Sequence, residues 1–164
     1  MRKSKLEFEI SNSMKLAGLL IFSLYLGGLF YIVFFAWNHG SSFGAMGPGG
    51  RNYNLEPGLS IERILLYSPN SRDPIRILGG NILMFVPFGM LLPFVVAAFS
   101  KKVLAIWQVI LASALLSLFI EVNQYLFTFR VANVDDVILN SLGGLIGAVV
   151  FSIFKSRFMY HHKP

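Results

Sequence analysis

The stretch SLFIEVNQYLFTFRVANVDDVILNSLGGLIG, residues 117–147, sets polar side chains inside a run that is otherwise apolar. These side chains belong to Glu121, Asn123, Gln124, Arg130, Asn133, Asp135, Asp136 and Asn140. A carboxylate or an amide in such surroundings costs about 1–3 kcal/mol unless it finds a hydrogen-bond partner or water. Ionisable residues inside a long apolar run are therefore candidates for a functional site.

The composition of the chain indicates a membrane protein. Of its 164 residues, 55% are hydrophobic and 13% are charged, and the mean hydropathy is +0.64. A helix needs about 20 apolar residues to cross a bilayer core of about 30 Å. The stretches that reach this length cover residues 16–37, 76–99, 103–127 and 134–154. We therefore predict an all-α integral membrane bundle of four transmembrane helices in the cell membrane.

The basic residues predict the orientation of the bundle. The formal net charge is +6, and nine of the 14 lysines and arginines flank the same ends of the predicted spans. They are Arg2, Lys3, Lys5 and Lys15 before the first span, Lys101 and Lys102 between the second and third, and Lys155, Arg157 and Lys163 after the fourth. Cytoplasmic loops carry such an excess, so both termini are expected in the cytoplasm and residues 38–75 in a long external loop. This topology explains the charge without a nucleic-acid partner.

A single membrane domain follows from this topology. We expect residues 16–154 to form one four-helix domain, with cytoplasmic tails at residues 1–15 and 155–164. The first apolar run exceeds the roughly 7–15 residues of a secretory signal, so we predict a retained anchor. The chain has no cysteine, which excludes disulfides, thiolate metal sites and a cysteine nucleophile.

The external loop contains one predicted helix. Glycine and proline in SSFGAMGPGG, residues 41–50, disfavour regular structure. The amphipathic pattern of residues 57–67 then predicts a short interfacial helix over the outer end of the bundle, with a freely mobile loop as the alternative. In the second span, Pro87 and Pro93 each remove a backbone donor, so we expect a kinked helix.

Polar residues of three spans fall at one predicted depth. At 1.5 Å per helical residue, Asn81 lies about 7.5 Å below the outer end of its span, and Glu121 and Asn140 lie about 9 Å below theirs. Gln124 shares a helix face with Glu121, and Asp136 shares one with Asn140. A common pocket that opens outward is the simplest arrangement in which these side chains find partners.

Structural roles compete with this interpretation. Asn133 is suited to cap the fourth span, with Asp135 and Asp136 in its first turn, where the helix dipole favours negative charge. Arg130 suits either an anchor at the interface or a partner for carboxylates and phosphate. Glu121 either pairs with a neighbouring polar side chain or faces a ligand. The histidines lack ligand spacing, so we expect no metal and no cofactor.

The ordered set of motifs resembles the VanZ-like family of small bacterial membrane proteins. The resemblance is carried by NLEP at residues 54–57, by NILMFVPFGMLLP at residues 81–93, and by the polar residues and glycines of residues 117–147. The polar signature of the family then falls on Asn81, Pro87, Glu121, Gln124, Arg130, Asp135, Asp136 and Asn140. Asn133 departs from the pattern, because the resemblance implies an acid there. The family implies a cell-envelope setting and glycopeptide resistance of the teicoplanin type, without an established reaction.

Three functions compete for these residues. The preferred one is a non-enzymatic membrane protein whose outward pocket binds the head group of a lipid-linked wall precursor or a lipoglycopeptide. The ligand-binding residues would then be Asn81, Glu121, Gln124, Arg130, Asp135, Asp136 and Asn140. The alternative is an intramembrane enzyme for a lipid-linked phosphate or glycosyl substrate, with Glu121 as the catalytic base and Asp136 as the acid or a metal ligand. A proton carrier built on Glu121 is disfavoured, because the cytoplasmic halves of spans two to four are nearly apolar.

Overall fold

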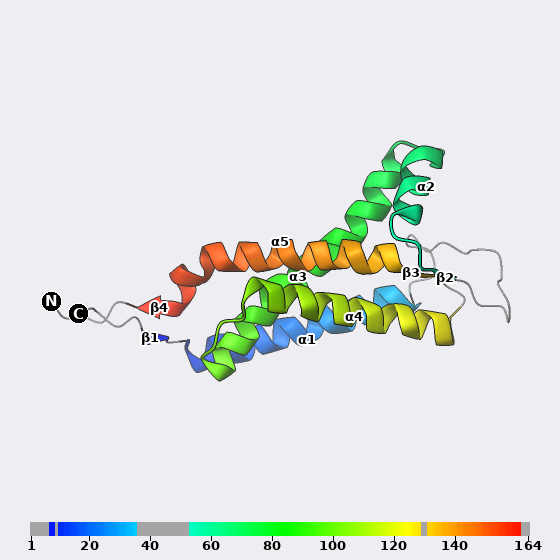
Figure 1. Cartoon of the computed structure of the whole chain (residues 1–164). Coiled ribbons are helices and arrows are strands. Elements are labelled where there is room, and N and C mark those ends of the chain that lie inside the picture. Colours follow the sequence, from blue (N-terminus) through cyan, green and yellow to red (C-terminus); the bar gives the residue numbers. More distant parts are fainter. Residues whose placement is uncertain (1–6, 9, 36–52, 129–130, 162–164) are drawn as a thin grey trace.

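The computed structural model describes residues 7–8, 10–35, 53–128 and 131–161. The described chain is helical apart from short strands, as the sequence predicts (Figure 1). The helices are α1 (Asn12–Phe35), α2 (Leu59–Tyr67), α3 (Arg72–Ser100), α4 (Ile106–Phe127) and α5 (Val134–Met159). The strands are β1 (Glu7–Phe8), β2 (Tyr53–Asn54), β3 (Ala132–Asn133) and β4 (Tyr160–His161). Because β1 pairs with β4 and β2 with β3, each strand joins segments that are far apart in the sequence.

Four of the described helices are long and apolar enough to cross a membrane. They are α1, α3, α4 and the part of α5 from Val134 to Lys155. Each overlaps one predicted span, so the prediction of four helices long and apolar enough to cross a membrane is confirmed. Both α1 and α3 begin about one turn before the predicted start, because polar residues extend a helix beyond its apolar core.

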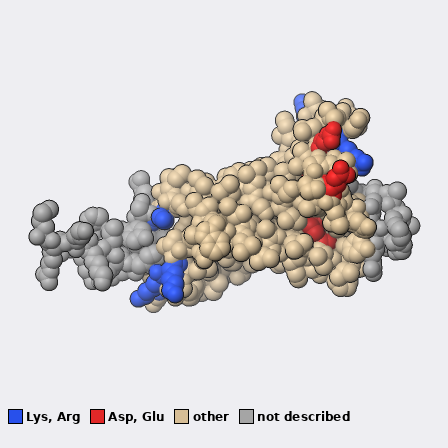
Figure 2. Space-filling view, viewed as in Figure 1, with Lys and Arg blue, Asp and Glu red and all other residues tan. Residues whose placement is uncertain are grey.

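Both ends of the described chain lie at the same end of the bundle (Figure 1). β1 pairs antiparallel with β4, and Glu7 lies opposite His161. In Figure 2, Lys and Arg side chains lie both at this end and at the opposite end, around α2, whereas Asp and Glu side chains appear at the end that carries α2. An even number of spans accounts for the position of both ends of the described chain at the same end of the bundle. Which end is cytoplasmic stays a prediction.

α3 and α5 share the most extensive contact among the described helices. Glycines line it: a side-chain carbon at Gly89 would collide with the carbonyl oxygen of Gly144, and one at Gly147 would collide with that of Val86. Without side chains at these positions the two backbones touch directly, as small residues permit between membrane helices. Gly143 lies in the same contact, because a carbon added there would collide with the carbonyl oxygen of Ile82.

α3 remains one helix across both of its prolines. It runs from Arg72 to Ser100 and includes Pro87 and Pro93. Close to the first proline, the hydroxyl of Tyr25 on α1 donates a hydrogen bond of 2.7 Å to the carbonyl oxygen of Met84. A neighbouring helix therefore supplies a donor beside the position where proline removes one.

Candidate functional site

A pair of short strands brings the segment before α2 against the start of α5. β2 and β3 pair in parallel, with Tyr53 opposite Ala132 and Asn54 opposite Asn133. The side chain of Asn54 donates a hydrogen bond of 3.1 Å to Oδ1 of Asn133 and one of 3.0 Å to Oγ of Ser60. Backbone pairing and side-chain bonding together hold α2 at the end of the bundle opposite β1 and β4 (Figure 1).

The carboxylate of Asp135 anchors the first turn of α2. Asp135 is 0% exposed, and it accepts hydrogen bonds from the backbone N–H groups of Gly58 at 2.6 Å, Ser60 at 2.8 Å and Ile61 at 3.2 Å. The first N–H groups of a helix lack partners within it, and the helix dipole favours a negative charge there. Gly58 has a φ of +88°, which favours glycine, and it offers no side chain for a cap.

The hydrogen bonds of Asp135 test two expectations from the sequence, one about the loop segment and one about Asp135 itself. The predicted helix over residues 57–67 is confirmed as α2. The sequence left Asp135 between a place in the first turn of its own helix and a ligand site. Asp135 does lie in the first turn of α5, and its carboxylate caps a second helix, α2. A bond between residues 77 positions apart, such as that from Gly58 to Asp135, has no local signal in the sequence.

Asn133 connects two further carboxylates. Its backbone N–H donates to Oε2 of Glu121 at 2.7 Å, and its Nδ2 donates to Oδ1 of Asp136 at 3.2 Å. Its Oδ1 accepts a bond of 3.2 Å from the N–H of Asp135, which is the geometry of an N-cap and confirms the expected cap on the fourth span. An ionised aspartate only accepts hydrogen bonds, so the amide of Asn133 makes a bond to Asp136 that an acid there could not make.

Asn81 extends this network to α3. Its Nδ2 donates a hydrogen bond of 3.0 Å to Oδ1 of Asp136, the oxygen that Asn133 also reaches. Hydrogen bonds thus connect four of the predicted ligand residues, with Asn133 at the centre. These four are Asn81, Glu121, Asp135 and Asp136.

Two other predicted ligand residues bond to neighbouring helices. Gln124 is buried, and its Nε2 donates a bond of 3.0 Å to the carbonyl oxygen of Val33, which ties α4 to α1. Asn140 is buried between α5 and α4 and donates a bond of 2.8 Å to Oγ of Ser117. Arg130, the remaining predicted ligand residue, lies outside the described residues.

Replacing Ser117 by alanine is expected to destabilise the bundle by about 0.6 kcal/mol, the average for hydrogen bonds between membrane helices. The change removes the acceptor of the Asn140 bond, and Oδ1 of Asn140 has no hydrogen-bond partner among the described residues. Thermal unfolding in detergent measures the effect. Ser141→Ala is the control, because the Ser141 hydroxyl bonds to Val137 within its own helix. A loss well above about 1.7 kcal/mol would contradict a simple helix contact.

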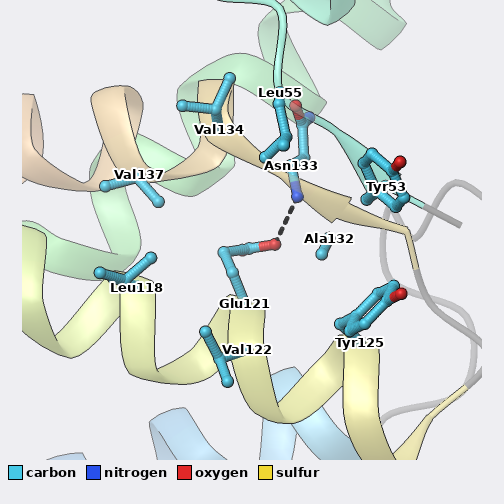
Figure 3. A pocket seen from close by; sticks show the side chains of 10 residues that line it. All are labelled: Tyr53, Leu55, Leu118, Glu121, Val122, Tyr125, Ala132, Asn133, Val134 and Val137. Atoms are coloured by element: carbon cyan, nitrogen blue, oxygen red, sulfur yellow. Dashed lines mark hydrogen bonds between the residues drawn. The ribbon is translucent and has the colours of Figure 1, made fainter.

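A cavity of about 440 Å³ lies between α4, the start of α5 and the paired strands β2 and β3. In Figure 3 the side chain of Glu121 points from α4 toward Asn133, with Tyr125 on one side of it and Leu118 on the other. The lining residues are Tyr53, Leu55, Leu118, Glu121, Val122, Tyr125, Ala132, Asn133, Val134 and Val137. Among them Glu121 alone carries a charge, and it is 6% exposed.

The cavity differs from the pocket that the sequence predicts. The expected pocket combined Asn81, Glu121 and Asn140, whereas Glu121 is the one of the three that lines this cavity. The other two side chains donate to Asp136 and Ser117. Depth along a helix does not set the direction in which a side chain points, so an equal depth was not sufficient to place all three in one space.

Sequence reasoning missed the apolar walls. Leu118, Val122 and Tyr125 lie three residues before, one after and four after Glu121, a spacing that puts all four on one face of α4. That pattern could have identified them. The wall from β2, including Tyr53, depends on a strand pairing between residues 79 positions apart, which has no comparable local pattern.

The model of one known protein family matches most of the chain. A family model described as VanZ/LLP1 matches residues 22–155, from within α1 to the end of the fourth candidate span. The matched range contains every residue that lines the cavity. No curated protein and no solved structure matches the chain.

Proposed function

The chain belongs to the VanZ/LLP1 family, and from this premise we propose that the protein binds the polar head group of a cell-envelope amphiphile in the Glu121 cavity. A lipid-linked wall precursor or a lipoglycopeptide has the required chemistry, because each joins an apolar chain to a head group that carries hydrogen-bond donors. A contribution to glycopeptide resistance of the teicoplanin type would follow from this binding. The observation that carries the proposal is a buried carboxylate in a cavity between membrane-spanning helices.

Glu121 has the surroundings of a ligand-binding group. Its carboxylate is oriented by the N–H of Asn133, and a carboxylate offers about four acceptor positions in all. Hydroxyl and amide groups of a head group are therefore suitable donors. The cavity volume of about 440 Å³ lies within the range of roughly 300–1,000 Å³ for small-molecule sites. Tyr53 and Tyr125 add aromatic faces with polar tips.

The other residues of the hydrogen-bond network hold the groups that line the cavity in place. Asp136 accepts hydrogen bonds from the side-chain amides of both Asn81 and Asn133, and Asp135 fixes the segment that follows β2. We assign to Arg130 the role of binding a phosphate or carboxylate of the ligand, since its guanidinium can form two parallel hydrogen bonds to such a group.

Changing Glu121 to glutamine is expected to weaken binding about tenfold or more, because a hydrogen bond to a charged group contributes about 1.5–3 kcal/mol. Glutamine keeps the shape of the side chain, and its carbonyl oxygen can still accept the Asn133 bond. The measurement is binding of a lipid-linked wall precursor to purified protein in vesicles. In parallel, a susceptible host that expresses each variant reports sensitivity to teicoplanin, with Arg130→Ala tested alongside.

Glu62→Gln is the matched control, because it makes the same change of charge on the exposed surface of α2. Its binding and resistance should equal those of the parent protein. If Glu121→Gln and Arg130→Ala both behave like this control, the cavity is not the binding site and the proposal is rejected.

A second candidate is an intramembrane enzyme that acts on a lipid-linked phosphate or glycosyl substrate. The observation that favours it is the shared partner of two carboxylates: Asn133 donates to Glu121 and to Asp136. Two acids in different surroundings can divide the roles of base and acid. In the part of the chain that the structure describes, no three His, Asp or Glu residues form a metal-binding group. Product formation by purified protein, abolished in Asp136→Asn, would establish this function, and no turnover over a broad lipid panel would reject it.

A further inference from the structure

The cavity changes character along its length. At one end, the rings of Tyr53 and Tyr125 meet edge to face, with centroids 5.9 Å apart. Figure 3 shows Glu121 in the middle and Leu118 and Val137 at the other end. The lining therefore passes from aromatic hydroxyls through a carboxylate to aliphatic side chains.

This gradient follows the axis of a membrane-spanning helix. α4 ends at Phe127, so Tyr125, Glu121 and Leu118 lie about 3, 9 and 13.5 Å from that end at 1.5 Å per residue. A bilayer changes in the same order, from an interface where tyrosine is enriched to a hydrocarbon interior. The cavity is thus polar where the interface lies and apolar toward the middle of the span.

The aliphatic end of the cavity lies at the lipid-facing surface of the bundle. Leu118, at this end, is 50% exposed, and Val122, beside Glu121, is 47% exposed; both belong to a candidate span. The exposed part of such side chains contacts lipid rather than water. A molecule that occupies this end of the cavity therefore also contacts the surrounding bilayer.

We propose that the cavity admits its ligand sideways from the bilayer, between α4 and α5, and holds the first part of a hydrocarbon chain against Leu118, Val122 and Val137. This inference rests on the proposed function and specifies the ligand as an amphiphile with an extended apolar chain, its head group beside Glu121. At about 440 Å³ the cavity is near the lower end of small-molecule sites. It therefore takes the head group and the adjoining carbons, and the rest of the chain stays in the lipid.

Contacts with the hydrocarbon chain of the ligand give the site selectivity for the orientation and shape of the ligand. A hydrocarbon chain that leaves lipid for an apolar wall exchanges one apolar environment for another, so the hydrophobic effect adds little. The head-group contacts supply most of the affinity, and the chain sets the direction of binding. A head group without a chain should bind the same site from water, but without a fixed orientation.

The test uses a long-chain alkyl glycoside that carries a diazirine on the part of its chain next to the sugar. The purified full chain in phosphatidylglycerol vesicles is irradiated with this probe, and the labelled residues are identified by mass spectrometry. We expect labels at Leu118, Val122 and Val137. Val122→Trp, which fills the half-exposed wall, should reduce labelling about tenfold, and Val137→Trp serves as the second variant.

Leu115→Trp is the matched control, because Leu115 is 58% exposed on the same helix and does not line the cavity. Labelling in this variant should equal that of the parent. Thermal unfolding of each variant verifies that the bundle is folded. Labels spread evenly over the lipid-facing residues of α4, or equal labelling in Val122→Trp and Leu115→Trp, would overturn the inference.

A short-chain, water-soluble glycoside separates this inference from the proposed function. If Glu121→Gln abolishes its binding but the long-chain probe does not label the cavity wall, head-group binding stands and side-on binding of the chain is wrong. If the cavity wall is labelled and Glu121→Gln changes neither the binding of the short-chain glycoside nor the labelling by the long-chain probe, the site for the hydrocarbon chain stands and the role of Glu121 is wrong.

Discussion

Gly89→Ala is expected to lower the free energy of unfolding of the bundle by about 1–3 kcal/mol, and Gly89→Val is expected to prevent α3 and α5 from packing. A carbon added at Gly89 would collide with the carbonyl oxygen of Gly144 and lie 2.8 Å from its carbonyl carbon. These are backbone atoms of α5, which cannot turn aside as the tip of a flexible side chain can. The two helices would have to separate along their main contact.

Gly80→Ala is the matched control in the same helix. A carbon added at Gly80 meets no atom within 4 Å, and alanine is a better helix former than glycine by about 0.8–1 kcal/mol. Its stability should therefore be unchanged or slightly higher. Thermal unfolding of the purified proteins in one detergent compares the variants. Equal melting of Gly89→Ala and Gly80→Ala would disprove the direct backbone contact between α3 and α5.

Asp135→Ala is expected to release α2 from the bundle. The change leaves the N–H groups of Gly58, Ser60 and Ile61 without their acceptor, and each hydrogen bond to a charged group contributes about 1.5–3 kcal/mol. α2 has nine residues, whereas isolated helices below about 12–15 residues are marginal in water. Hydrogen exchange at Ser60 and Ile61 should become fast, and proteolysis within α2 should increase.

Asp73→Ala is the control for the loss of a carboxylate at the same end of the molecule, in the first turn of α3. It should leave hydrogen exchange in α2 unchanged. Asp135→Asn should fall between the two, because one amide oxygen remains while the amide nitrogen faces donors. Unchanged protection of Ser60 and Ile61 in Asp135→Ala would show that other contacts hold α2.

The spans could be predicted from the sequence because apolar length is a local property. Residues 103–127 contain α4, and residues 134–154 lie within α5. The cap formed by Asn133 was likewise predictable, since it bonds to Asp135 two positions later. Where the interacting residues lie within a few positions of each other in the sequence, the pattern of side chains was sufficient to predict the structure.

The arrangement of the site was less predictable because it depends on distant partners. The pairing of Asn54 with Asn133 joins residues 79 positions apart, and it holds Asn133 at the centre of the hydrogen-bond network. Gln124 shares a face with Glu121, yet it bonds to Val33 on α1. Which neighbour a polar side chain meets is set by how the helices pack, and the sequence of one helix does not contain that information.

The bond from Asp135 to α2 also orders the biogenesis of the protein. A ribosome makes Gly58 and Ser60 about 75 residues before it makes their acceptor. During synthesis α2 therefore lacks this cap until the first turn of α5 has been made. A chain that ends before Asp135 would therefore leave these N–H groups of α2 without their acceptor.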